Sequence, residues 1–397
     1  MSDTTNAADT RSEINWRTFS LLGLLAVIAV VFHFLSGGLF LTPRNVYNLM
    51  VQTSVVAIIA TGMALVITTR NIDLSVGSML GFIGMVIAFL QIQVFPAEAA
   101  WNWPLSIVIG LGLGALIGAW QGVWVAYLGV PSFVVTLGGL LVFRGLAFEV
   151  AQGRTLAPFQ PAYQLFGGGI DGAIGVGPSW IVFALAMALY ALADLFIYRR
   201  KRRLGFHASA PVHLIRFALV LAAGLVLVMT MNAYTKPRTD IGRGVPIPAL
   251  ILLAAILSME FIARFTTFGR YVFAIGGNTE AARLTGIPTR RIVTFVFVIQ
   301  GILCAIAAVV ATARLNAGTS STGELLELSV IAAAVIGGVS LSGGRGTVSG
   351  AVIGAFVIQS LDSGMVLIGA SSSQRMVAIG MILMVAVLAD QLLSRDK

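Results

Sequence analysis

The polar loop at residues 268–291 carries the pattern best suited to binding another protein. It reads FGRYVFAIGGNTEAARLTGIPTRR and separates two long apolar segments. Glu280, Ala281 and Ala282 are followed by Gly286, which gives the pattern E-A-A-x-x-x-G. Two alanines allow close approach of a partner, and a glycine ends a short helix well. We therefore expect a short helix that docks into a partner. The candidate docking residues are Gly269, Arg270, Asn278, Glu280, Ala281, Ala282 and Gly286.

Two further stretches interrupt apolar runs with polar residues and glycines. The first is TTRNIDLSVGSM at 68–79, and the second, at 332–356, contains Ser342 followed by a cluster of glycines. Broken helices in a membrane are tolerated only where protein buries the backbone or the segment lines water. We expect both stretches near the gates of a transport path, with Asp73 as an N-cap for the next helix. Gate-shaping, direct solute contact and incidental placement remain open. The tentative path residues are Asn71, Asp73, Ser75, Ser78, Ser342 and Asp362.

The sequence offers no arrangement for catalysis. The three histidines share no ligand spacing, and Cys304 is the only cysteine, which excludes disulfides and cysteine-ligated metals. The glycine-rich GGRGTVSG lacks the lysine that a phosphate-binding loop requires. We therefore expect no enzyme activity, no cofactor and no metal site, and any ATP hydrolysis must occur in a separate chain.

Two ionisable residues lie deep within apolar segments, where charge is costly. These are Arg144, in LVFRGLAFE, and Asp362, in QSLDSGM. They are expected to pair with each other or with backbone carbonyls, and a structural tie is favoured over a chemical role.

Glycines recur at every fourth position along the segment 104–127, at Gly110, Gly114, Gly118 and Gly122. Such a ridge allows two helix backbones to approach closely in lipid. We expect this helix to be central in the bundle. Trp120 and Trp124 repeat at the same spacing, and packing or interface anchoring is favoured over stacking on a solute.

The composition indicates an all-α, polytopic transmembrane bundle. Charged residues make up 10% of the 397 residues, and the mean hydropathy is +0.95. Only helices or closed barrels satisfy every backbone group in lipid, and the runs lack the alternation of barrel strands. The net charge of +9 is concentrated at the ends of the apolar runs, so it does not indicate nucleic-acid binding.

About ten to twelve membrane segments are predicted, since a span needs about 20 apolar residues. The stretch 328–341 is short enough that it must tilt or break. The candidate segments are 19–40, 46–68, 74–95, 104–127, 132–150, 180–198, 213–231, 247–265, 292–314, 328–341, 347–368 and 376–392.

The distribution of charge predicts the orientation and the boundaries of the parts. The basic run at 199–203 and the loop 268–291 should both face the cytoplasm. The polar N-terminal tail (1–18) and the C-terminal tail (393–397) fall on the same side. A single transmembrane domain then occupies 19–392, and the outer loop 232–246, with three basic residues, departs from the charge rule.

The string GRYVFAIGGNTEAARLTGI, together with IDLSVGS, resembles the sugar permeases of ABC importers. The resemblance spans about 41–392 and is nearest to the xylose-type members, through the segment 199–246, which looks inserted relative to ribose-type permeases. Leu361-Asp362-Ser363-Gly364-Met365 fits the same branch, although family members usually have Asn where Ser363 stands. The family implies that 268–291 couples the chain to an ATPase.

The resemblance implies a subunit that moves a neutral monosaccharide, xylose or a related sugar, across the bacterial inner membrane by alternating access. It also implies a homodimer, a cytoplasmic ABC ATPase and a periplasmic sugar-binding protein. Two alternatives remain: an ion-coupled secondary transporter, and an ABC permease for another small metabolite such as an amino acid. The sequence does not name the sugar.

Overall fold

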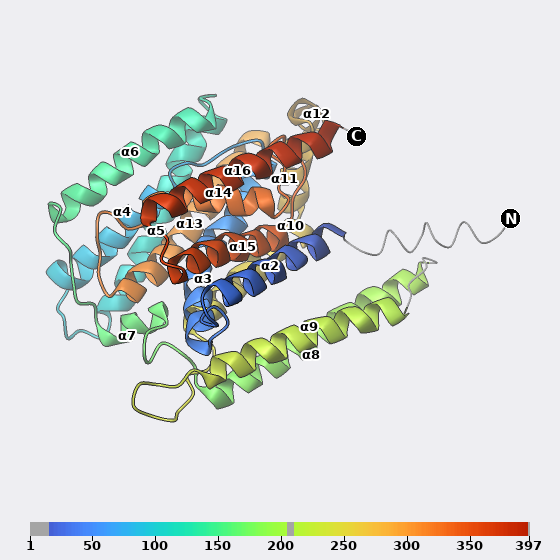
Figure 1. Ribbon diagram of the computed structural model, residues 1–397. Helices are drawn as coiled ribbons and strands as arrows, with labels where there is room; N and C mark the ends of the chain where they lie inside the picture. The colour runs from blue at the N-terminus through green and yellow to red at the C-terminus, as the bar shows by residue number, and fades with distance from the viewer. Residues whose placement is uncertain (1–15, 205–209, 396–397) are drawn as a thin grey trace.

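The computed structural model describes residues 16–204 and 210–395, and within them it is built from helices (Figure 1). The predicted tail 1–18 lies mostly outside these residues, and the last helix continues three residues into the predicted tail 393–397. The elements are α2 (Trp16–Leu35), α3 (Pro43–Thr68), α4 (Val76–Phe89), η1 (Leu90–Val94), α5 (Asn102–Ala126), α6 (Ser132–Ala151), α7 (Pro161–Gln164), η2 (Leu165–Gly167), α8 (Val176–Arg203), α9 (Ala210–Ala233), α10 (Ile247–Phe265), α11 (Thr267–Gly277), α12 (Thr279–Leu284), α13 (Thr289–Leu315), α14 (Leu326–Ile336), α15 (Val348–Leu367) and α16 (Ser372–Arg395).

Within the described ranges, nine helices are long and apolar enough to cross a membrane. Shorter apolar helices lie at Ser20–Leu35, Leu326–Ile336 and Ser372–Val385, so each predicted segment corresponds to a helix. This confirms the all-α polytopic fold. The stretch predicted at 328–341 is the helix α14, which has only 11 residues. At 1.5 Å per residue it covers about 16 Å, roughly half of the hydrocarbon core.

The helix α3 forms the centre of the bundle. Of its 18-residue apolar window, 94% is buried, because α10, α13, α14 and α15 all pack around it. Its side chains Ile58, Ile59 and Met63 have no exposed surface. Burial all round identifies a core helix rather than a lipid-facing one.

The helices α5 and α13 pack with their backbones in direct contact. A Cβ atom placed at Gly114 or Gly118 would meet the carbonyl oxygens of Gly301 and Phe297 on α13, and one at Gly122 would meet Thr294. Gly110 lies instead against Ile87 of α4. The glycine face of α5 thus fixes the two helices together. On the adjoining face, Trp120 packs edge-on against Trp124 and Phe143, and both tryptophans are more than a third exposed.

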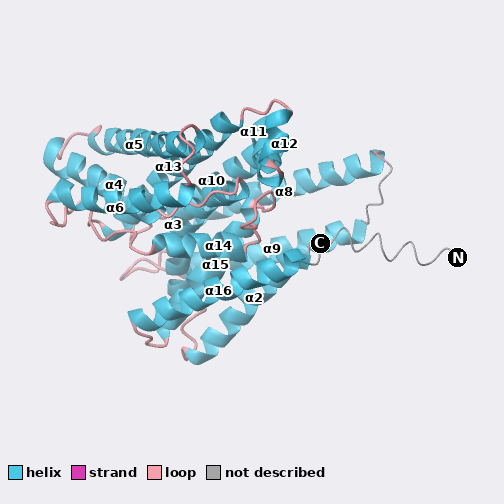
Figure 2. Ribbon diagram, turned by 90° about the horizontal axis from the view of Figure 1, so that it is seen from above, coloured by secondary structure: helices cyan, strands magenta, loops and turns pink. Residues whose placement is uncertain are grey.

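The helices α8 and α9 form a hairpin that is set apart from the main bundle (Figures 1 and 2). No residue in the apolar window of α8 is buried, and only 11% of the α9 window is. The carboxylate of Asp194 lies 2.9 Å from Nδ1 of His213 and joins the two helices. This hairpin coincides with most of the segment 199–246 that the sequence singles out.

The short helices α11 and α12 lie together at one end of the bundle (Figure 2). This end also carries the basic run 199–203 at the end of α8, and we call it the inner end. The opposite, outer end carries the connections 36–42, 95–101 and 234–246. The bias of cytoplasmic loops towards positive charge predicts that the inner end faces the cytoplasm.

Candidate functional site

The helix α12 is capped at both ends by its own sequence. At its start, the side-chain Oδ1 of Asn278 accepts a hydrogen bond from the amide of Ala281 at 3.0 Å. At its end, the amide of Gly286 donates to the carbonyl of Arg283, and the amide of Ile287 donates to that of Ala282. Gly286 has a φ of +83°, which glycine adopts without strain. These two hydrogen bonds form a Schellman motif. They fix the end of a helix that has only six residues.

The outward face of α12 is free for contact. Leu284 is 76% exposed, and the side chains of Glu280 and Arg283 are 65% and 66% exposed. Glu280 and Arg283 form an ion pair at 2.6 Å, and the hydrogen bond and charge of Arg283 lower the pKa of Glu280. Ala282 faces inward and is buried. An apolar tip beside a fixed ion pair is a surface that a protein partner can recognise.

The helix α11 fastens α12 to the bundle. The Oγ1 of Thr266 caps its start by accepting from the amide of Gly269 at 3.2 Å. Gly269 lies against backbone carbonyls of Ile262 and Ala263, and Gly276 is packed so closely that a Cβ atom there would overlap Thr68 and Gly344. Two glycines therefore allow α11 to lie directly on the backbone of the bundle. Arg270 is exposed on its other face.

The two broken stretches meet at the end of α11. The guanidinium of Arg70 donates from Nε to the carbonyl of Gly276 and from Nη2 to that of Gly277, both at 2.8 Å. The amide of Gly344 donates to the carbonyl of Thr68 at 3.0 Å. The end of α11, the end of α3 and the connection between α14 and α15 thus form one hydrogen-bonded junction.

Most of the polar residues at 68–79 are buried within the chain. Asp73 accepts from the amide of Ser75 at 2.9 Å and from its hydroxyl at 2.7 Å, and Gln121 donates to the same hydroxyl at 2.7 Å. Asp73, Ser75 and Ser78 have no exposed surface, while Asn71 is half-buried and bonds to Thr69. The N-cap prediction for Asp73 is wrong: Ser75 holds the N-cap position, and the Asp73 carboxylate ties the turn that precedes it.

The other two path candidates, Ser342 and Asp362, and the deep residue Arg144 make contacts outside this cluster. Ser342 is exposed at the inner end and bonds to Ser340 at 2.9 Å. Asp362 pairs with Nη1 of Arg375 on α16 at 2.9 Å. Arg144 donates to the carbonyls of Ser320 and Thr322 at 2.7 and 3.1 Å. Of the two partners expected for Arg144, the backbone carbonyls are therefore the ones it contacts.

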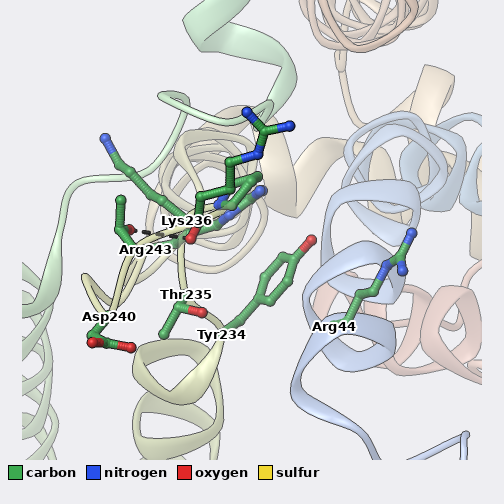
Figure 3. A pocket seen from close by; sticks show the side chains of 9 residues that line it. Arg44, Tyr234, Thr235, Lys236, Asp240 and Arg243 are labelled. Carbon is green, nitrogen blue, oxygen red and sulfur yellow. Dashed lines mark hydrogen bonds between the residues drawn. The ribbon is translucent and has the colours of Figure 1, made fainter.

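A basic pocket of about 550 Å³ opens at the outer end, between the start of α3 and the loop after α9 (Figure 3). Arg44, Lys236, Arg238 and Arg243 line it, against the single acid Asp240. Arg243 is 7% exposed, with its guanidinium 4.2 Å from the ring centre of Tyr234. This lining attracts anionic groups and offers little to a neutral solute. It also explains the departure of the loop 232–246 from the charge rule, because these cations gather in one pocket.

Several of the residues that organise the site carry no local signal in the sequence. Arg70 is the residue that ties the first broken stretch to α11, and Gln121 completes the bonds around Ser75. Arg375 partners Asp362 from the next helix. Each contact joins segments that only the folded bundle brings together. Arg70 adopts a positive φ of +64°, a conformation that an arginine in the sequence does not indicate.

Residues 45–388 match the protein family described as "Branched-chain amino acid transport system / permease component". The chain belongs to this family. As a permease component, it is a multi-pass protein of the bacterial inner membrane whose role is translocation rather than catalysis.

The curated relatives of this permease match it over nearly its whole length. It is 39% identical over 383 residues to the xylose transport system permease protein XylH of Escherichia coli K12, covering 96% of this chain and 93% of that protein. It is 38% identical to the XylH protein of Haemophilus influenzae, covering 95% and 96%. The ribose import permease protein RbsC of E. coli K12 is 33% identical over 372 residues, covering 94% and 92%. No solved structure matches this permease.

Proposed function

We propose that this permease is the membrane subunit of an ATP-driven importer that moves a neutral monosaccharide, xylose or a close relative, into the cell. The observation that carries the proposal is the capped helix α12, held at the inner end with its outward face exposed. A membrane chain that lacks a nucleotide-binding loop of its own requires such a contact to receive the energy of ATP hydrolysis.

The junction at the end of α11 supports mechanical coupling. Arg70 and Gly344 connect the coupling loop to both broken stretches through hydrogen bonds of 2.8 to 3.0 Å. Interfaces with discrete packing arrangements convert small shifts into larger rearrangements. Docking of an ATPase on α12 would therefore shift the helices that open and close the path.

The names of the relatives favour a sugar over an amino acid as the transported solute. The family description refers to branched-chain amino acids, whereas the relatives that cover more than nine tenths of both chains carry xylose and ribose in their names. A zwitterion needs binding groups of both charges, whereas a neutral polyol needs hydrogen-bond donors and acceptors. Among the described residues, most of the buried polar side chains carry a hydroxyl or an amide, and few carry a charge.

An ion-coupled mechanism is disfavoured by the contacts of the two ionisable residues that the sequence singles out. The guanidinium of Arg144 is bound to two backbone carbonyls, and Asp362 is paired with Arg375. A proton or sodium relay needs groups that can exchange partners. These two residues instead act as structural ties.

The proposal includes three partners: a second copy of this permease, a cytoplasmic ATPase that docks on α12, and an extracytoplasmic sugar-binding protein. The outer basic pocket supports the last of these. Lys236 is paired with Asp171, but Arg44, Arg238 and Arg243 still outnumber Asp240 in the lining, and a net positive lining complements an acidic protein surface.

The solute is tested by uptake into proteoliposomes that contain this permease and its ATPase, with the binding protein outside and ATP inside. Radiolabelled xylose should accumulate, and unlabelled xylose or a related aldose should compete with it. Excess leucine should not compete with xylose for uptake. Accumulation of leucine in place of any sugar would overturn the sugar assignment and leave the coupling assignment intact.

A further inference from the structure

The connection between α13 and α14 runs down into the bundle rather than across its outer surface. Gly318 lies against Ala88 of α4, Thr322 against Gly81, and Gly323 against Gly77. From Ala88 to Gly77 the helix descends eleven residues, about 16 Å at 1.5 Å per residue. The half-length helix α14 begins at the bottom of this descent. The segment 316–325 therefore crosses the outer half of the membrane as irregular backbone, beside α4 (Figure 1).

This descending segment exposes polar side chains at membrane depth. Ser321 and Glu324 are both exposed on the surface of the single chain. A carboxylate at this depth is costly unless it faces water or protein, and non-helical backbone is tolerated only under the same condition. Lipid therefore does not cover this face.

A second carboxylate lies three residues further along the chain. Glu327, in the first turn of α14, is 7% exposed, and its Oε2 has no hydrogen-bond partner among the described residues. The carboxylate touches Gly77, where a side chain would displace it. The start of a helix favours negative charge. The base of the descending segment therefore holds a buried acceptor that lacks a donor within the chain.

We propose that the segment 316–325 and the start of α14 form the sugar-contacting wall of the transport path, with Ser321 and Glu324 binding sugar hydroxyls. The proposal rests on the function proposed above and names the part of the chain that performs it. Of the roles left open for the stretch 68–79, direct solute contact is disfavoured, because Asp73 and Ser75 are enclosed within the chain.

The chemistry of this wall fits a neutral polyol. Carboxylate oxygens accept from hydroxyl groups, and the hydroxyls of Thr319, Ser321 and Thr322 can donate or accept; they already bond to one another at 2.8 to 3.4 Å. The neighbouring cation is Arg144, whose guanidinium is held by the carbonyls of Ser320 and Thr322. Arg144 is thus a positioning residue that fixes the descending backbone.

The proposal is tested by cysteine labelling in membrane vesicles that contain the complete transporter. The native Cys304 is first replaced by Ala, since it is buried and adds background. Ser321→Cys and Glu324→Cys should react with a charged, membrane-impermeant thiosulfonate at least about tenfold faster than Leu189→Cys, because the thiolate forms in water and not in lipid. Leu189 is the matched control: it is 65% exposed on the lipid-facing helix α8. Added sugar should slow the reaction at positions 321 and 324 only.

A second readout separates a binding role from a structural one. Glu324→Gln keeps the shape of the side chain and removes its charge. The KM for sugar uptake should rise about tenfold, the loss expected for a charge-assisted hydrogen bond. Co-purification with the ATPase should be unchanged. Labelling at 321 and 324 no faster than at 189, in vesicles whose unmodified transporter takes up sugar, would overturn the proposal and leave the function standing. A different outcome would overturn the proposed function instead: positions 321 and 324 are labelled rapidly, but the unmodified transporter takes up no sugar.

Discussion

The guanidinium of Arg70 lies 2.8 Å from the carbonyl oxygen of Gly276, a residue 206 positions further along the chain. This bond joins the end of the central helix α3 to the end of α11, immediately before the coupling helix α12. With the bond from Gly344 to Thr68, it makes the inner end of the bundle a single mechanical unit. A hydrogen-bond network of this kind can carry coupling between an ATPase and the transport path.

Loss of the Arg70 side chain should uncouple transport. Arg70→Gly removes the guanidinium, and glycine retains the φ of +64° without strain. We expect ATP-driven uptake to fall about tenfold, equivalent to about 1.4 kcal/mol, because two hydrogen bonds from a charged group are lost. Membrane insertion should be unchanged. Arg216→Ala, which removes an exposed arginine from α9, away from the junction, serves as control. Full uptake by Arg70→Gly would show that the junction does not transmit coupling.

The backbone conformation of Gly286 should decide whether α12 can dock. Gly286→Val forces a β-branched residue to a φ of +83°, at a cost of about 1–2 kcal/mol. Co-purification with the ATPase should fall about tenfold. A Cβ atom added at Gly286 would meet nothing within 4 Å beyond its chain neighbours, so the effect comes from the backbone and not from crowding. Gly286→Asn should dock nearly normally, because asparagine tolerates this conformation. Equal binding by the valine and wild-type forms would disprove the role of the turn.

Cysteines at the two broken stretches should differ in accessibility. In a chain lacking Cys304, Ser342→Cys should react with a polar thiol reagent from the inner side, because Ser342 is exposed. Ser75→Cys should not react, because Ser75 is enclosed by Asp73 and Gln121. If the stretches act as gates, trapping the ATPase with nucleotide should change these rates. Rapid labelling at 75 in the resting state would contradict the observed burial.

Backbone contact between α5 and α13 should be required for a stable bundle. Gly118→Val places a side chain against the carbonyl of Phe297, and overpacking of this kind typically costs about 1–3 kcal/mol. The apparent melting temperature of the detergent-solubilised permease should fall. Gly112→Val lies on the same helix, and its added atoms meet open space. Equal losses from the two variants would indicate a general intolerance of valine in α5.

The sequence predicts those features that depend on local pattern. Gly286 marks the end of α12 because a left-handed residue is needed there, and the four-residue spacing of the α5 glycines marks one helix face. The apolar stretch 328–341 is only just long enough to cross if it is tilted or broken, which already marks it as an unusual span, and the helix there has 11 residues.

The remaining features depend on contacts between distant segments. Asp73 resembles an N-cap by its position, but its carboxylate bonds to Ser75, which occupies that position itself. The descent of residues 316–325 has no local signature, since the segment reads like an ordinary polar outer loop. Only the packing of Gly318 and Gly323 against α4 reveals its depth.

The central claim, ATP-driven import of a sugar, is tested most directly by uptake of labelled xylose into proteoliposomes that contain this permease and its ATPase. The binding protein is supplied outside, and the energy source is varied. ATP enclosed in the vesicles should drive accumulation, and a variant ATPase that cannot hydrolyse ATP should abolish it. A proton or sodium gradient without ATP should have no effect. Accumulation driven by an ion gradient in the absence of ATP would contradict the account and favour an ion-coupled transporter.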